Sequence, residues 1–315
     1  MKNPIQILIL LSIITFAACT KDEPDNPLAS DDLATNYFTI DGATLNAGAL
    51  PQASAGAPVL NSVVVPGFLT PGTTVPMAFD IDAEVTSVLI SVIGIDGYYE
   101  VPATALKSTQ STSSIYLKIS QSFNTPGFVA TIAVKTSTGA ISAHADLGLA
   151  MNSSGSTNYL SYDNAVSALP ASYISHNTGW DYSNVYSMAL NLYTSGFTGF
   201  TSFGNGNYTL SGIGNFLRFG INSDLSNKLG VGMYNIINQS YTGNQEAAFL
   251  AGAEFYLNYN GDTDEMEKWL AINSGAIAVL NNSTEYEIIF DLIDEEGKVI
   301  NGYYKGSVEY FEYAE

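Results

Sequence analysis

The feature that most constrains the fold is a repeating rhythm of short strand-like runs with hardly any helical periodicity. Runs rich in Val, Ile, Thr, Tyr and Phe are separated by Gly, Pro and Asn along the chain. β-Branched and aromatic side chains pack well on a pleated sheet, whereas Gly, Pro and Asn favour turns. Charged residues are only 13% of the sequence, below the roughly 25% usual for globular chains. The sequence therefore predicts an all-β protein with uncharged polar faces.

The first half predicts an antiparallel β-sandwich over residues 36–151. Turn signals such as Pro71-Gly72 and Pro126-Gly127 separate the runs, and short strands at this spacing are typical of sandwiches. The rhythm from Ala57 to Ala150 resembles immunoglobulin-like or fibronectin-type modules of bacterial surface proteins, without the Cys and Trp pattern of true immunoglobulin domains. The predicted strands are Tyr37–Ile40, Val59–Val65, Val75–Ile81, Val85–Ile93, Tyr98–Val101, Ile115–Ser120, Phe128–Lys135 and Ile141–Leu149.

A second all-β domain is predicted over residues 158–315, either a sandwich or a lipocalin-like barrel. The polar segment Asn152–Thr157 has the composition of a flexible hinge. The alternation of Tyr286–Leu292, followed by the Gly-containing turn Asp294–Lys298, predicts a terminal hairpin. The other predicted strands are Tyr159–Tyr162, Tyr186–Thr194, Phe216–Ile221, Gly232–Ile237, Ala253–Asn258, Gly275–Leu280 and Gly302–Tyr313.

Two local patterns in the chain predict further features. Thr263–Ile272 predicts the one helix, because Thr263 can cap it and acids occupy its first turn. Asn36–Ala43 and Asn158–Ala165 match in kind at every position, and each is soon followed by Ala-Leu-Pro. The match has two open interpretations: a duplicated domain start, or two opening strands that each end in an Asp turn.

The N-terminus predicts export and lipidation. Lys2 precedes the apolar run Ile5–Phe16, and Ala17-Ala18 lead into Cys19, the one cysteine of the chain. The run is too short to cross a bilayer core of about 30 Å as a helix. The segment resembles the lipobox of bacterial lipoproteins, which implies that residues 1–18 are a signal peptide and that Cys19 is acylated, with palmitate among its chains.

The residues behind the cysteine predict a surface-exposed tether. Residues 19–35 are acidic and poor in apolar side chains, so they cannot bury enough surface to fold. Lys21, Asp22 and Glu23 resemble the surface-export signal of Bacteroidota lipoproteins. The strand pattern from Ser274 onward resembles the closing strands of many uncharacterised lipoproteins of that phylum. The resemblance implies an outer-membrane location, with the protein facing outward or, alternatively, the periplasm.

Charge and motifs exclude several classes of function. The formal net charge is −20, so phosphate backbones would repel the chain, and we expect no nucleic-acid partner. Motifs of serine hydrolases, zinc proteases and phosphate-binding loops are absent from the sequence. His144 and His176 stand in no recognisable catalytic or haem-binding setting. We therefore predict no cofactor and no enzymatic activity.

Two groups of residues are candidate ligand sites. Asn260, Asp262 and Asp264 place oxygens alternately, as in calcium loops, but Glu265 and Ala271 stand where an EF-hand needs Gly and Glu. A helix N-terminus explains the same acids. Trp180, Tyr182 and Tyr186 lie in an aromatic-rich stretch and could stack on a glycan, although β-domains also use aromatics in their cores.

The sequence thus predicts a lipid-anchored, non-enzymatic binding module. Its partner would be a glycan, another macromolecule or an outer-membrane protein. The alternatives are a structural or adhesive spacer without a small ligand and, third, a hydrolase.

Overall fold

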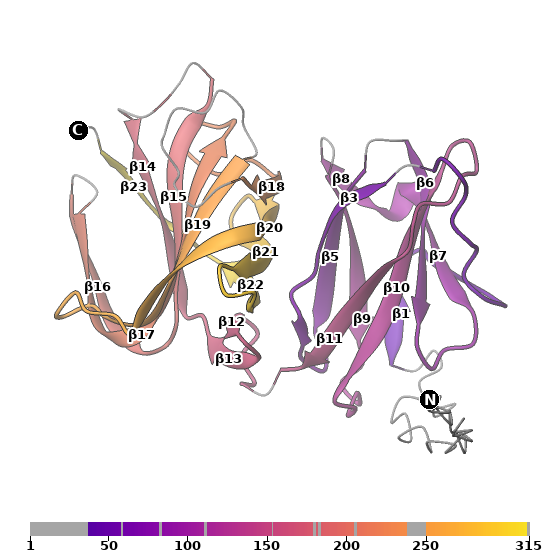
Figure 1. Ribbon diagram of the computed structural model, residues 1–315, viewed down its shortest axis with the longest axis horizontal. Helices are drawn as coiled ribbons and strands as arrows, with labels where there is room; N and C mark the ends of the chain where they lie inside the picture. Colours follow the sequence, from indigo (N-terminus) through magenta and orange to yellow (C-terminus); the bar gives the residue numbers. More distant parts are fainter. Residues whose placement is uncertain are drawn as a thin grey trace, which may run out of the picture.

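The computed structural model describes residues 37–57, 59–81, 84–109, 112–152, 154–178, 181, 184–204, 207–237 and 250–313. Within these residues the chain is mostly β-strand, with a short 3-10 turn, η2 (Ala103–Ala105), and no α-helix. It follows that no described helix could cross a membrane. Strands up to Met151 form two sheets and strands from Tyr159 form a third, as two bodies side by side (Figure 1). The predicted all-β fold is confirmed.

The N-terminal body is a sandwich of two sheets. The first sheet runs in the order β1 (Phe38–Ile40), β9 (Thr112–Ile119), β5 (Thr74–Ile81) and β3 (Leu60–Val64), with β8 (Lys107–Thr109) paired to β9. The second runs in the order β2 (Thr44–Asn46), β7 (Tyr98–Pro102), β6 (Val85–Val92), β10 (Gly127–Thr136), β11 (Ala145–Met151) and β4 (Phe68–Leu69). Among the described strands of the sandwich, only β4 and β11 pair in parallel.

The pairing follows the strand order of an immunoglobulin-like sandwich. Strands β3, β5 and β9 occupy the places of A, B and E, and β7, β6, β10 and β11 those of C′, C, F and G. Alternate residues of both sheets point into one apolar core, which includes Phe38, Phe79, Ile90, Leu117 and Ile132. The core also explains the strand alternation in the sequence, because every second residue must be apolar to fill it.

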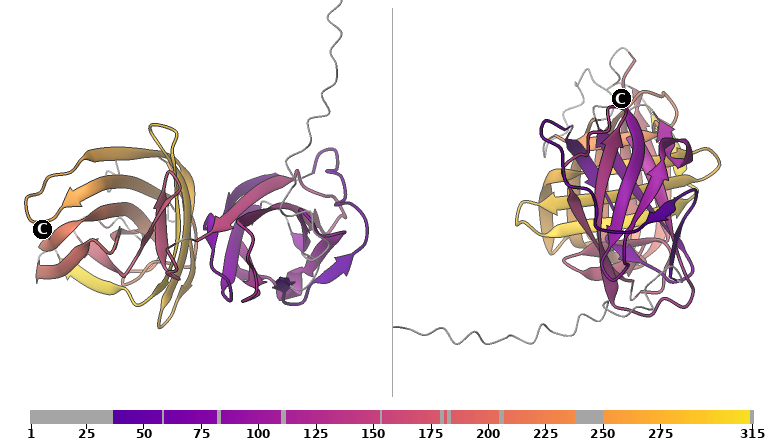
Figure 2. Two further views of the ribbon diagram at one scale, coloured as in Figure 1. Left: turned by 90° about the horizontal axis from the view of Figure 1, so that it is seen from below. Right: turned by 90° about the vertical axis from the view of Figure 1, so that its right-hand side faces the viewer.

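The C-terminal body is one long curled sheet. Its order is β13 (Ala165–Ala168), β12 (Tyr159–Tyr162), β22 (Val299–Gly306), β21 (Tyr286–Asp294), β20 (Lys268–Asn282), β18 (Gly232–Ile236), β19 (Leu250–Asn260), β17 (Asn207–Ser223), β15 (Tyr186–Tyr193), β14 (Ala171–Asn177) and β23 (Glu309–Tyr313). β16 (Phe197–Gly204) pairs with the first part of β17. The sheet curls into a half-barrel, seen most clearly in Figure 2.

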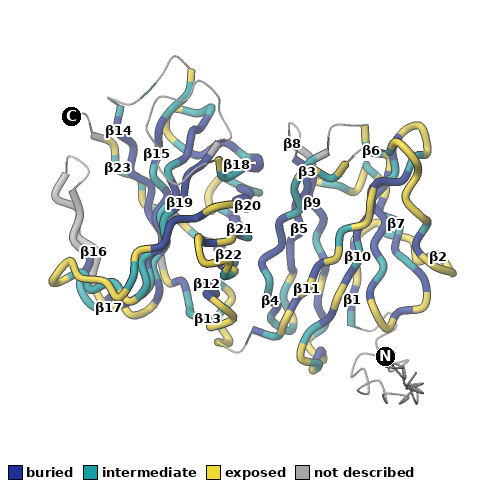
Figure 3. Tube along the Cα trace, viewed as in Figure 1, coloured by how far each residue is buried: buried dark blue, intermediate teal, exposed yellow. Residues whose placement is uncertain are grey.

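The inner face of the half-barrel forms its core. Inward-pointing residues from strands all around the curl meet there, including Leu190, Phe219, Phe255, Ile277 and Phe290, and all five are fully buried. Figure 3 shows buried segments running along these strands. Because it curls, this single sheet encloses its own core, whereas the sandwich needs two sheets to enclose one.

The predicted helix over Thr263–Ile272 is wrong. Asn260 to Glu265 form a tight turn, in which the Asn260 N–H donates to the Glu265 carbonyl at 2.7 Å, and β20 begins at Lys268. Leu270 and Ile272 then point into the half-barrel core. The cap and the acidic first turn are local signals, and the pairing of β20 with β19 and β21 overrides them.

The predicted hairpin is confirmed. β21 and β22 pair antiparallel from Tyr286–Gly306 to Ile293–Val299. Gly297 adopts φ +80° in the connecting turn, a conformation that glycine allows at no steric cost. The Asp294 side chain accepts the N–H groups of Glu296 and Lys298, both at 2.8 Å. Because the residues of this hairpin alternate, every second side chain faces the half-barrel core and the others face outward.

The two matching segments build different structures after the same start. Strand β12 turns through Asp163 and Asn164, both with positive φ, and pairs with β13 as a hairpin. β1 turns through Gly42, also with positive φ, but β2 then joins the opposite sheet of the sandwich. The structural likeness is therefore a strand followed by a tight turn, as in the second interpretation.

An apolar joint connects the two bodies. The outer faces of β18, β20, β21 and β22 pack on β3 and β5 of the sandwich through a cluster of small and branched residues: Val64, Ala78, Met233, Ala276, Ala278 and Ile289, flanked by Leu280 and Tyr303. The main members of this cluster are buried. Since apolar burial stabilises by roughly 25 cal/mol per Å², the joint stabilises the contact between the two bodies.

Hydrogen bonds fix the register of this joint. The Ser62 hydroxyl donates to Asn235 Oδ1 at 2.8 Å, and the Met233 N–H donates to Thr112 Oγ1 at 2.9 Å. Tyr159, at the start of the half-barrel, donates its hydroxyl to the Phe68 carbonyl of the sandwich at 2.6 Å. These bonds position the edges of the two bodies that face one another.

Candidate ligand pocket between the sandwich and the half-barrel

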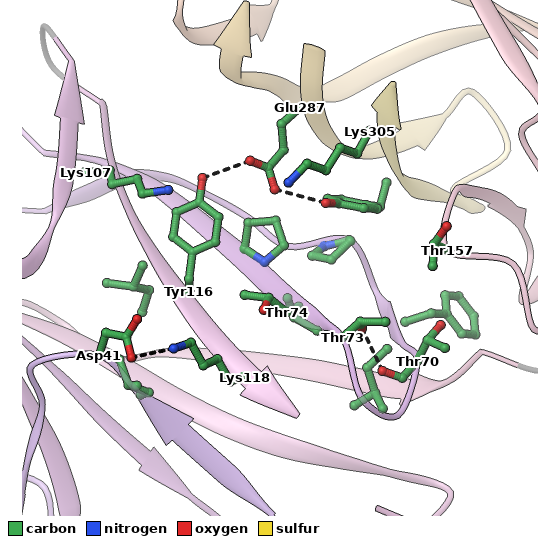
Figure 4. A pocket seen from close by; sticks show the side chains of 18 of the residues that line it. Asp41, Thr70, Thr73, Thr74, Lys107, Tyr116, Lys118, Thr157, Glu287 and Lys305 are labelled. Atoms are coloured by element: carbon green, nitrogen blue, oxygen red, sulfur yellow. Dashed lines mark hydrogen bonds and ion pairs between the residues drawn. The ribbon is translucent and has the colours of Figure 1, made fainter. Parts of the chain in front are cut away.

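The pocket forms where β3 leaves the first sheet of the sandwich. The last pair of β3 with β5 joins Val64 to Ala78, so the earlier residues of β5 have only β9 beside them. Pro76 lies in this one-sided stretch, where a strand tolerates proline. Gly67 then turns the chain with φ +76°, and a Cβ there would collide with the Asn301 side chain of the half-barrel. The exposed edge and the half-barrel enclose a cavity of about 610 Å³ (Figure 4).

A buried carboxylate lies in the wall of the pocket. Glu287 is on β21, on the face opposite the half-barrel core, and it is only 6% exposed. Its Oε2 accepts the hydroxyl of Tyr116 from the sandwich at 3.2 Å, and its Oε1 accepts the hydroxyl of Tyr303 at 3.0 Å. Burial, and then the charge of Glu287, raise the pKa of both tyrosines. Both hydroxyls therefore stay protonated donors that hold the carboxylate in place.

Three lysines line the same cavity. The Lys107 ammonium stands 4.0 Å from the ring centroid of Tyr116, and Lys118 pairs with Asp41 at 2.7 Å. Lys305 enters from the half-barrel. Figure 4 shows Lys107 and Lys305 pointing toward the Tyr116–Glu287 pair from opposite sides. The pocket thus holds three of the ten Lys and Arg residues of the chain, but only three of its thirty acids.

The rest of the lining combines hydroxyls with an apolar wall. Thr70, Thr73 and Thr74 come from the turn before β5 and from its first residue, and the Thr73 hydroxyl donates to the Thr70 carbonyl at 2.7 Å. The apolar wall consists of Ile40, Pro66, Phe68, Leu69, Val75, Pro76, Val101, Ala105 and Ile115. Small-molecule sites are commonly cavities of about 300–1,000 Å³ with apolar walls and a few placed polar groups. This cavity has both properties.

No protein-family model matches the sequence, and no curated protein matches it either.

Of the predicted aromatic site, the structure describes Tyr186, which does not line this pocket. Tyr186 lies at the start of β15, and its ring meets His176 edge-on at 6.3 Å between centroids. Trp180 and Tyr182 lie outside the described residues, as do Cys19, Lys21, Asp22 and Glu23. Tyr186 therefore packs against His176 and does not line the pocket.

The predicted calcium residues serve the turn between β19 and β20. Asn260 Oδ1 accepts the Asp262 N–H at 3.0 Å, Asp262 Oδ2 accepts the Gly212 N–H at 3.1 Å, and Asp264 Oδ1 accepts the Tyr259 hydroxyl at 2.8 Å. Within the part of the chain that the structure describes, no group of three or more His, Cys, Asp or Glu could hold a metal ion. These oxygens have partners within the turn and around it.

Both histidines have local partners. His176 is buried at the end of the half-barrel core, between Asp181 Oδ1 at 2.9 Å from Nε2 and the Tyr310 hydroxyl at 2.7 Å from Nδ1. His144 lies on the sandwich, and its Nε2 is 2.8 Å from the Pro51 carbonyl. Neither histidine lines the pocket.

Sequence reasoning missed the residues that form the pocket. Lys107, Tyr116, Glu287, Tyr303 and Lys305 come from both bodies and are far apart in the chain. One signal existed: Glu287 stands on the polar side of a strongly alternating strand. An acid at such a position is normally solvated, and only the packing of the sandwich against this face shows that it is buried.

Proposed function

We propose that the protein is a lipid-anchored, non-enzymatic binding module at the outer membrane, facing outward, and that it binds a glycan in the pocket between the sandwich and the half-barrel. The observation that carries the proposal is the cavity of about 610 Å³ with polar groups from both bodies around it. The hydroxyls of a sugar form hydrogen bonds with hydroxyl, ammonium and carboxylate groups. Its C–H faces pack on an apolar wall.

The bonding of Glu287 favours binding over catalysis. Both oxygens of its carboxylate accept tyrosine hydroxyls, and the side chain is almost fully buried. A general acid or base needs an atom within hydrogen-bond reach of the substrate, whereas these contacts turn the carboxylate into a fixed part of the wall. Such pre-organisation lowers the entropy lost when a ligand binds.

The test is a binding screen with a blocked-pocket variant. Protein from Thr20 onward would be titrated by calorimetry against neutral and acidic oligosaccharides, after a thermal-shift screen selects the responsive class. Thr74→Trp would place a large ring in the cavity, because Thr74 lines it and is exposed. We expect saturable binding to the unmodified protein and none to this variant.

Thr138→Trp is the matched control. Thr138 is an exposed turn residue of the sandwich that does not line the pocket, so the same substitution there should leave binding unchanged. Equal binding by both variants would place the ligand elsewhere. A flat response across all oligosaccharides would reject the glycan and favour a structural role.

A further inference from the structure

Lysines and acids line the pocket in equal number, three of each. Of the acids, Asp41 is paired with Lys118, and Glu285 is exposed, as are Lys107 and Lys305. Glu287 is the acid buried in the wall, and tyrosine hydroxyls occupy both of its oxygens. Among the described residues, neither Lys107 nor Lys305 is in an ion pair. Two of the three lysines that line the pocket are therefore without an ion-pair partner among the described residues.

Equal numbers of lysines and acids are unusual for this chain. Acids outnumber Lys and Arg by thirty to ten over the whole sequence, so a randomly placed cavity would be acidic. Lys107 belongs to β8 of the sandwich and Lys305 to β22 of the half-barrel. Both point toward the same pair of side chains (Figure 4). A ligand between them could therefore be held by both bodies at once.

The remaining lining narrows the chemistry of such a ligand. Four threonines offer hydroxyls, and the prolines and aliphatic side chains offer an apolar wall. A compact inorganic anion could use the ammonium groups and the hydroxyls, but it would leave the apolar wall without contact. A sugar that carries a carboxylate would use the ammonium groups for its acid, the threonines for its hydroxyls and the apolar wall for its C–H face.

We infer that the ligand of this pocket is an acidic glycan, whose uronate carboxylate is bound between Lys107 and Lys305. The inference rests on the proposed glycan-binding function and names its substrate class. A charge-assisted hydrogen bond contributes roughly 1.5–3 kcal/mol, so loss of one lysine should weaken binding by about tenfold or more.

The experiment compares one sugar skeleton with and without its charge. The full chain, purified in detergent, would be titrated with a trimer of galacturonic acid and with the fully methyl-esterified trimer, which is neutral. The variants are Lys107→Gln and Lys305→Gln, and the control is Lys228→Gln. Lys228 does not line the pocket, so its loss removes the same charge from another place on the half-barrel. Thermal unfolding of each variant verifies that it is folded.

We expect the acid trimer to bind at least about tenfold more tightly than its ester, with this preference lost in both pocket variants and kept in the control. Added salt should weaken binding of the acid and leave that of the ester unchanged. Equal affinity for acid and ester, or full affinity in both lysine variants, would overturn the acidic-glycan assignment and leave the proposed function standing if neutral oligosaccharides bind. Absence of binding to the acid, the ester and every neutral oligosaccharide would instead reject the proposed function itself.

Discussion

The sandwich and the half-barrel bury their apolar residues in different ways. The sandwich encloses its core between two sheets, so each sheet has one covered face and one face toward its surroundings. The half-barrel encloses its core by curling one sheet, so its whole inner face is covered by other parts of the same sheet. The outer face of the curled sheet takes no part in this core, and part of that face packs on the sandwich.

The difference explains where the pocket lies. On β21 the inner residues are Ile288, Phe290 and Leu292, which form the core, and the outer residues include Glu287 and Asp291. The outer face does not have to fill a core, so it can hold small and polar residues that fit an edge of the sandwich. A joint between a curved outer face and a sheet edge leaves a gap, and the pocket occupies it.

The strongest test of the comparison uses adjacent residues of β21 on opposite faces. Phe290→Ala should destabilise the protein by about 3–5 kcal/mol, as large-to-small changes in a packed core do. Ile289→Ala, at the joint, should cost only about 2 kcal/mol, because the two bodies can move together and close part of the cavity. Both residues are fully buried. Urea unfolding followed by circular dichroism measures the two costs, and equal values would show that the joint is packed as rigidly as the core.

A second test uses the carboxylate of Asp291, on the same outer face. Asp291 stands opposite Asn301, whose Oδ1 is buried without a hydrogen-bond partner among the described residues. Burial raises the pKa of Asp291 to about 6, so the folded state binds this proton more tightly than the unfolded state. The resulting penalty is absent below about pH 4 and complete above about pH 6, so stability falls as pH rises between them.

Asp291→Asn should remove this dependence. At about 1.36 kcal/mol per pKa unit, the variant should be more stable than the parent by about 3 kcal/mol at pH 7 and equal to it near pH 4. Urea unfolding of both proteins between pH 4 and pH 8 gives the difference. A constant difference at every pH would mean that Asp291 is solvated, and that the outer face is not closed by the joint.

A smaller effect is expected at the hydroxyl that connects the two bodies. Tyr159→Phe removes the bond to the Phe68 carbonyl and should cost about 1 kcal/mol, close to the net value of a buried hydrogen bond. Tyr98→Phe is the control, because the Tyr98 hydroxyl makes no hydrogen bond with the described residues and it should cost nothing measurable. A cost for Tyr159→Phe as small as for the control would show that the joint depends on its apolar contacts alone.

The smallest effect is expected at the rim of the pocket. Lys118→Gln breaks the ion pair with Asp41, in which both side chains are at least half exposed. Exposed pairs contribute only about 0.2–1 kcal/mol and are screened by salt. Melting temperatures in low and high salt measure this, and a large loss at high salt would contradict it.

The regular parts of the fold could be predicted from sequence, but the joint could not. Alternation identified the hairpin of β21 and β22, because one face of each strand meets the core. Thr263–Ile272 was predicted wrongly, since its cap and acids are local signals whereas strand pairing depends on β19 and β21. The pocket depends on two bodies meeting. No local pattern shows that Glu287 and Tyr116, 171 positions apart, share a hydrogen bond.

The bond from Tyr159 to the sandwich has a consequence for cleavage of the chain. The segment before it is the one covalent crossing between the bodies among the described residues, and Gly155 and Thr157 in it are exposed to a protease. The hydrogen bond from Tyr159 to Phe68 and the apolar joint are both non-covalent contacts that do not depend on that crossing. A protein nicked there would keep its two halves together as one particle, and the half-barrel would remain attached to the sandwich.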